Sequence, residues 1–176
     1  MKAKNIVFAG LFIALGALMP QVFHVLGGPG LGKMLLPMHL PVLIAGFMLN
    51  PPVALLVGIL SPVCSFLYTG GSMPPVPTLY FMMIELGIYG FVASLCFEKY
   101  KLSIIVSLVL SMILGRVVHT CVFLFVTAVL DMTLPPALSI GAILGQSVPG
   151  IILQVVFIPP ILYAMNKKGW LKRNDA

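Results

Sequence analysis

Three side chains that can bind small polar molecules lie in stretches that are otherwise apolar. Arg116 and His119 lie three residues apart within the apolar run 102–130, and Glu85 lies within the apolar run 79–97. Residues at i and i+3 share one face of a helix, so Arg116 and His119 are expected to point the same way. A central arginine costs a membrane helix roughly 2.5 to 3.5 kcal/mol and nearly always faces a partner or a ligand. These residues are therefore the first candidates for a binding site.

Two kinds of chemistry fit this set. A guanidinium binds a carboxylate through two parallel hydrogen bonds, so Arg116 and His119 predict a small ligand that carries a carboxylate. The alternative is an ion pair between Glu85 and Arg116 that only cross-links two helices. The residues alone leave both interpretations open.

The composition places these residues in a membrane protein. Hydrophobic residues make up 60% of the 176 residues, charged residues 8%, and the mean hydropathy is +1.14. Such a chain has too little polar surface for a water-soluble domain, and a membrane span needs about 20 apolar residues. We predict an all-α membrane protein, a single domain over 1–176 with six transmembrane helices in one compact bundle, at approximately 6–25, 35–50, 52–68, 79–97, 102–130 and 142–165.

The basic residues predict the orientation of the bundle. With the N-terminus in the cytoplasm, eight of them fall on one side: Lys2, Lys4, Lys99, Lys101, Lys167, Lys168, Lys172 and Arg173. This is the pattern of the positive-inside rule, so both termini are expected to be cytoplasmic. The net charge of +6 then reflects topology, and nucleic-acid binding is a poor explanation for it.

The predicted topology gathers the polar side chains in the outer half of the bundle. At 1.5 Å per residue, Glu85 lies about 9 Å below the outer start of its helix and Arg116 about 21 Å above the inner start of its own, which puts them at similar depth. Other polar residues in this half include His24, His39, Lys33 and Gln146. We expect a pocket that opens outward, with His39 and Gln146 as further candidates. Lys33 is either a solvated loop charge or a ligand contact.

Several functions are disfavoured. The segment 27–33 imitates a phosphate-binding loop, but Met34 replaces the required serine or threonine, so we interpret it as a flexible outer loop. Zinc-protease motifs and intramembrane aspartate pairs are absent from the sequence, and Ser147 with His119 is a poor nucleophile pair, so we expect no enzyme. The loop from Thr69 to Thr78 is long enough to act as a lid or as a passive connector.

Small residues mark one face of the first helix. Gly10, Ala14 and Ala17 recur at i, i+4 and i+7, which predicts a smooth surface for another helix. That helix belongs either to a partner or to the same bundle.

Several segments in this order resemble the substrate-binding S components of energy-coupling factor (ECF) vitamin transporters. They are 35–47 (LLPMHLPVLIAGF), 58–62 (GILSP), 69–77, 85–90 (ELGIYG), 115–116 and 149–154 (PGIILQ). The resemblance implies a bacterial plasma-membrane subunit that captures a vitamin from outside and docks on a scaffold subunit with two ATPases. It implies that Gly10, Ala14 and Ala17 contact the scaffold. It also implies that the outer loop Thr69 to Thr78 gates the pocket and that the later helices line it with Glu85, Tyr89, Arg116, His119 and Gln146.

The S components that this chain most resembles imply nicotinate or pantothenate as the ligand, and both are small carboxylates. The chain itself is expected to bind no cofactor or metal, because ATP is used by the partner subunits. The main alternative is a self-sufficient secondary transporter of a small organic anion, in which Glu85 couples uptake to protons. A purely structural membrane protein would leave the cluster of ionisable groups unexplained.

Overall fold

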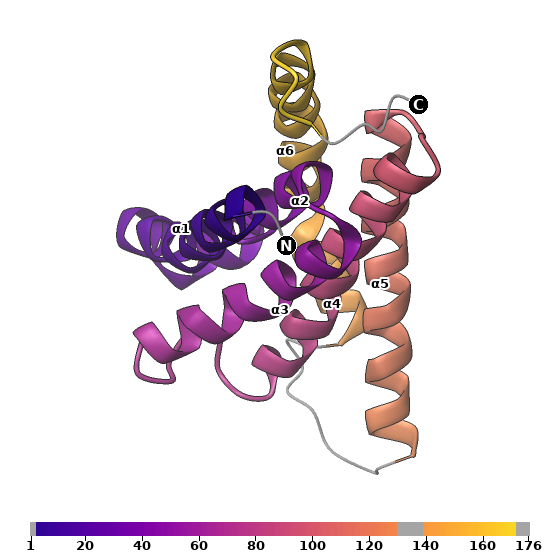
Figure 1. Ribbon diagram of the computed structural model, residues 1–176. Helices are drawn as coiled ribbons and strands as arrows, with labels where there is room; N and C mark the ends of the chain where they lie inside the picture. The colour runs from indigo at the N-terminus through magenta and orange to yellow at the C-terminus, as the bar shows by residue number, and fades with distance from the viewer. Residues whose placement is uncertain (1–2, 130–138, 172–176) are drawn as a thin grey trace.

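The computed structural model describes residues 3–129 and 139–171, without the side chains at 27, 29–33, 140, 142–144 and 146 (Figure 1). Every regular element in these ranges is a helix, as the all-α prediction requires. In chain order they are α1 (Ala3–Leu35), α2 (His39–Met48), α3 (Pro51–Tyr68), α4 (Thr78–Ser94) with its π-helical continuation η1 (Leu95–Lys99), α5 (Ile104–Ala128) and α6 (Ile140–Lys167).

Five stretches are long and apolar enough to cross a membrane, so this is a multi-pass membrane protein. They are Ala3–Leu26, Pro51–Tyr68, Thr78–Lys99, Ile104–Ala128 and Ser147–Lys167. Five of the six predicted spans are thus confirmed as helices of sufficient length. Their high hydropathy reflects the 60% of hydrophobic residues in the chain.

The predicted second span, 35–50, is wrong in its bounds. Here α2 has only ten residues, a rise of about 15 Å, or half of the roughly 30 Å that a bilayer core requires. Leu36 has a positive φ of 50° and turns the chain before α2. At the other end Leu49 is extended (φ −117°, ψ 155°), and Pro51 opens α3. The chain therefore turns on both sides of a half-length helix.

The predicted flexible loop at 27–33 is also wrong. The backbone stays helical as far as Leu35, with one break at Gly28, where φ is 71° and ψ is −176°. Only glycine adopts such angles without strain, because it has no Cβ. A proline follows directly, and its missing N–H costs nothing in the first turn of a helix. The segment therefore forms a kink and a further helical piece.

Close helix contacts at glycines hold α4 in the centre of the bundle, between α3, α2 and α5 (Figure 1). A Cβ on Gly58 of α3 would overlap the backbone of Leu86 in α4, and a Cβ on Gly90 of α4 would meet the backbone of Ala54. Small residues let membrane helices approach closely where lipid gives no hydrophobic driving force for association. These contacts fix the face that α4 turns toward its neighbours.

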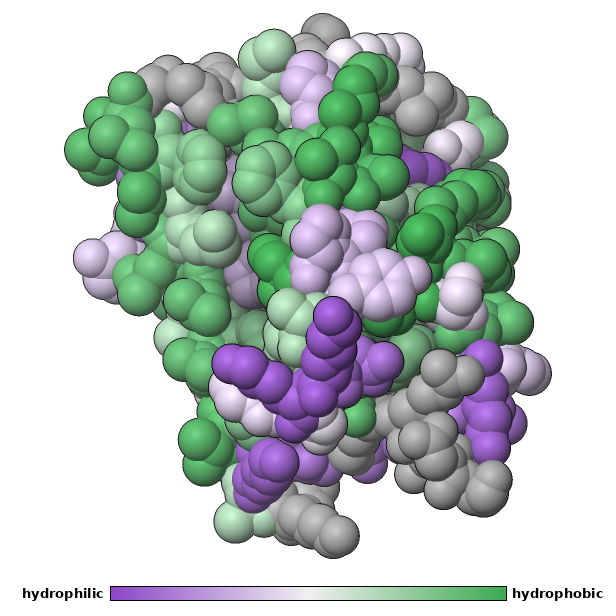
Figure 2. Space-filling view, turned by 90° about the horizontal axis from the view of Figure 1, so that it is seen from above, coloured by the Kyte–Doolittle hydropathy of each residue, from purple (hydrophilic) through white to green (hydrophobic). Residues whose placement is uncertain are grey.

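The face seen in Figure 2 is largely apolar, and its strongly hydrophilic side chains are gathered on limited parts of it. The outward faces of α1 and α5 carry exposed large apolar side chains, among them Val7, Leu11, Leu18, Ile113, Val117 and Phe125. An open apolar groove runs between α1, α2 and α6 and is lined by Phe12, Leu15, Met19, Phe23, Leu40, Pro41, Ile44, Leu153, Phe157 and Ile161. This surface suits contact with lipid or with other membrane helices.

Candidate functional site

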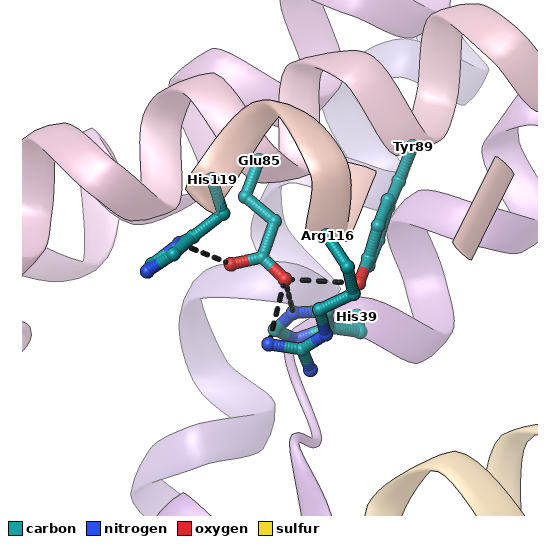
Figure 3. A network of polar contacts seen from close by, with 5 residues as sticks. All are labelled: His39, Glu85, Tyr89, Arg116 and His119. Atoms are coloured by element: carbon teal, nitrogen blue, oxygen red, sulfur yellow. Dashed lines mark hydrogen bonds and ion pairs between the residues drawn. The ribbon is translucent and has the colours of Figure 1, made fainter. Parts of the chain in front are cut away.

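Glu85 lies at the centre of a buried polar cluster formed by α2, α4 and α5 (Figure 3). Its Oε1 accepts a hydrogen bond from the Tyr89 hydroxyl at 2.9 Å and lies 3.1 Å from Arg116 Nη1. His39 Nε2 is 3.8 Å from the same oxygen. The second oxygen, Oε2, lies 3.0 Å from His119 Nδ1. One carboxylate thus contacts four side chains from three helices.

Helical spacing explains how two of these helices supply their residues. Glu85 and Tyr89 are one turn apart on α4, and Arg116 and His119 are three residues apart on α5. Gly115 lets the two helices meet, because a Cβ there would overlap the Tyr89 ring. The glycine therefore makes room for the tyrosine that donates to Glu85.

Aromatic rings hold both imidazoles in place. The His39 ring meets the Tyr89 ring edge-on, with centroids 5.3 Å apart. The Phe81 ring lies 5.1 Å from the His119 ring. All four side chains are buried, so these contacts restrict how the imidazoles can rotate. Phe81 is not among the residues predicted from the sequence, although its position four residues before Glu85 places it on the same face of α4.

Four nitrogen atoms of this cluster are buried without a hydrogen-bond partner among the described residues. They are His39 Nδ1, Arg116 Nε, Arg116 Nη2 and His119 Nε2. An unsatisfied buried polar group costs about 1 to 3 kcal/mol. Four such atoms beside one carboxylate have hydrogen-bonding capacity that the described residues do not use.

The formal charges of the cluster balance when both imidazoles are neutral. Glu85 is 5% exposed and Arg116 15% exposed in their side chains, so this ion pair is largely removed from water. Burying two charges is costly, and their mutual attraction offsets the cost only when further hydrogen bonds support the pair. Tyr89 and His119 supply such bonds to Glu85, whereas two nitrogens of Arg116 donate to no group among the described residues.

The structure brings together five of the seven predicted ligand-binding residues: His39, Glu85, Tyr89, Arg116 and His119. Glu85 and Arg116 meet directly, as their predicted depths suggested. The side chains of Lys33 and Gln146 lie outside the described residues. A role in ligand binding stays a prediction for all seven.

The predicted lid is a loop between α3 and α4, in which the backbone N–H of Met73 donates to Thr69 Oγ1 at 3.0 Å. Along the first helix, Gly10 and Ala14 are exposed, whereas Ala17 is only 6% exposed and belongs to the buried side of α1. The three small residues therefore do not form one free face. Their role in docking, like that of the lid, stays a prediction.

Comparison with known proteins gives one family. Residues 4–162 match the model of the family described as "ECF transporter, substrate-specific component". The match covers nearly the whole chain and every helix that contributes to the cluster. No curated protein and no solved structure matches the chain.

Proposed function

The chain belongs to the family of ECF transporter substrate-specific components, and from this premise we propose that it captures a small vitamin bearing a carboxylate and passes it to an ATP-driven partner complex. Nicotinate and pantothenate represent the proposed ligand class. The family consists of substrate-binding transporter components and not of enzymes. We place the ligand at the cluster around Glu85.

One observation supports this site most strongly, namely the unpaired edge of the Arg116 guanidinium. Nη1 faces Glu85 at 3.1 Å, while Nε and Nη2 are buried and have no hydrogen-bond partner in the part of the chain that the structure describes. The N–H bonds of Nε and Nη2 point the same way, and this pair matches the two oxygens of a carboxylate. Arg116 can therefore hold Glu85 on one side and a ligand carboxylate on the other.

This geometry makes the structural ion pair and the ligand clamp compatible. A residue that only cross-linked α4 and α5 would need a single contact, and a lysine would supply it. The planar guanidinium instead leaves two donors open in a buried position, at about 1 to 3 kcal/mol for each unsatisfied group. A bound carboxylate removes that cost, which favours ligand binding over a purely structural role.

The energy for transport comes, in this proposal, from partner subunits: a membrane scaffold and two ATPases. Gly10 and Ala14 offer exposed small residues on α1 for close contact with a scaffold helix, with the buried Ala17 beside them. We propose a bacterial plasma-membrane location with both termini in the cytoplasm. The hydrogen bond from Asn5 Nδ2 to Asn50 Oδ1 at 3.1 Å brings the start of α3 beside the start of α1, although α2 is too short to span. Counting α3 to α6 from there, the described basic residues Lys99 and Lys167 fall on the side of Lys4, which supports this orientation.

The deciding experiment compares vesicles that contain this chain alone with vesicles that also contain the scaffold and ATPase subunits. We expect uptake of labelled pantothenate or nicotinate only in the complete set, and only with ATP. Accumulation by the chain alone under a pH gradient would instead support the alternative, a proton-coupled secondary transporter that uses Glu85. Native mass spectrometry of gently purified protein adds an independent test, because a retained carboxylate should appear by its mass.

A further inference from the structure

The tautomer of His119 follows from its contact with Glu85. Nδ1 lies 3.0 Å from Oε2 of the carboxylate. Glu85 faces the Arg116 guanidinium at 3.1 Å and accepts from the Tyr89 hydroxyl, which are the contacts of an ionised carboxylate. An ionised carboxylate only accepts hydrogen bonds. The hydrogen between these two groups therefore belongs to Nδ1 of His119.

The other ring nitrogen, Nε2, is then a hydrogen-bond acceptor. A neutral imidazole carries one N–H, and the nitrogen without it presents a lone pair. The ionisable groups around His119 are Glu85 and Tyr89 of α4, Arg116 of its own helix and His39 of α2. Glu85 and Arg116 already compensate each other, so a protonated His119 would leave a net charge in a site shielded from water.

Two further observations keep this acceptor in place. His119 is 5% exposed and its ring packs against the ring of Phe81, with centroids 5.1 Å apart. Nε2 itself is buried and has no hydrogen-bond partner within the described parts of the chain. The site therefore combines a pair of donors on Arg116 with a fixed, unsatisfied acceptor one turn away on α5.

We propose that the ligand carries, besides its carboxylate, a hydroxyl or N–H group that donates a hydrogen bond to Nε2 of His119. This inference rests on the proposed function and narrows its ligand class. A hydroxylated or amide-bearing carboxylate such as pantothenate satisfies both positions. The ring nitrogen of nicotinate is an acceptor, so it would meet the lone pair of His119 unfavourably.

The first experiment reads the tautomer without any ligand. The chain has three histidines, so protein with isotope-labelled histidine, together with single His→Gln variants for assignment, gives resolved signals in long-range hydrogen–nitrogen correlation spectra. At neutral pH we expect His119 to carry its hydrogen on Nδ1 and none on Nε2. A protonated Nε2, as either the other tautomer or the imidazolium, overturns the inference.

The second experiment compares two probes by calorimetry on the purified full chain. We expect pantothenate to bind at least about tenfold more tightly than nicotinate, since one hydrogen bond and one acceptor–acceptor contact separate them. Equal or reversed affinities overturn the inference and leave the carboxylate proposal standing. If neither probe binds, the carboxylate proposal fails and the inference falls with it.

Variants of His119 separate ligand contact from structural support. His119→Asn places an amide N–H near the position of Nδ1 and preserves the bond to Glu85, but it removes the acceptor at Nε2. We expect about tenfold weaker pantothenate binding in a protein that still folds, whereas nicotinate binding should strengthen because its acceptor–acceptor contact with Nε2 is gone. His24→Asn is the matched control, because His24 Nδ1 is also buried, has no hydrogen-bond partner among the described side chains, and lies on α1. Unchanged pantothenate affinity in His119→Asn contradicts the proposed contact.

Discussion

Replacing Arg116 by lysine separates the two roles assigned to its guanidinium. A lysine retains one positive charge opposite Glu85, where Arg116 Nη1 now lies 3.1 Å from Oε1. It lacks the planar edge formed by Nε and Nη2, which have no partner in the described structure. The variant should therefore fold normally and bind the carboxylate ligand poorly.

The size of the effect follows from the bonds that are lost. A hydrogen bond to a charged group contributes about 1.5 to 3 kcal/mol. Arg116→Lys replaces two such bonds to the ligand by at most one, so binding should weaken about tenfold to a hundredfold. Arg116→Ala differs, because it leaves the buried carboxylate of Glu85 without its cation, which costs about 3 to 5 kcal/mol of stability.

The assay combines calorimetry with pantothenate or nicotinate and thermal unfolding in detergent. Arg116→Lys should lose affinity while keeping its unfolding temperature. The double variant Glu85→Gln with Arg116→Ala should regain stability relative to Arg116→Ala and still fail to bind. Wild-type affinity in Arg116→Lys would refute the carboxylate clamp. A loss of stability in Arg116→Lys equal to that in Arg116→Ala would show that the fold itself needs the guanidinium.

Three further predictions concern support for the site and docking. Gly115→Ala should destabilise the fold by about 1 to 3 kcal/mol in chemical unfolding, because the new Cβ overlaps Tyr89. Gly10→Ala is the control and should be neutral, because nothing lies within 4 Å of its added Cβ. Equal effects of the two substitutions would contradict the packing of Gly115 against Tyr89. Tyr89→Phe removes the donor at 2.9 Å from Glu85 and should cost about 1 kcal/mol of stability with ligand affinity little changed, so a large loss of binding would make Tyr89 a ligand contact. Ala14→Trp should abolish co-purification with the scaffold and ATPases while ligand binding persists, and retained assembly would exclude this face of α1.

Several parts of the site are readable from local sequence. Residues one turn apart share a face of a helix whatever surrounds it, so the pairs Glu85 with Tyr89 and Arg116 with His119 are set by spacing alone. The similar depth of Glu85 and Arg116 follows from the helical rise and the alternating direction of the spans. The same spacing places Phe81 on the face of Glu85, but an apolar side chain is no obvious candidate for a polar site.

Other features depend on how the helices pack. His39 joins the cluster from the first residue of α2, and the length of that helix is set by turns at Leu36 and Leu49. Ala17 is buried whereas Gly10 and Ala14, on nearly the same face of α1, are exposed. A membrane helix that is apolar all round carries no periodic signal to say which side is covered.

The sequence by itself determined that the protein is a helical membrane protein with a few ionisable side chains inside it, because composition and the 3.6-residue repeat act locally and independently of the fold. Only the tertiary structure decided which edge of the Arg116 guanidinium faces Glu85 and which nitrogen of His119 is left open. Those orientations depend on helix rotation and separation, which are fixed by close contacts such as that of Gly115 with Tyr89. The residue pattern of one helix does not predict which residues of another helix it will contact.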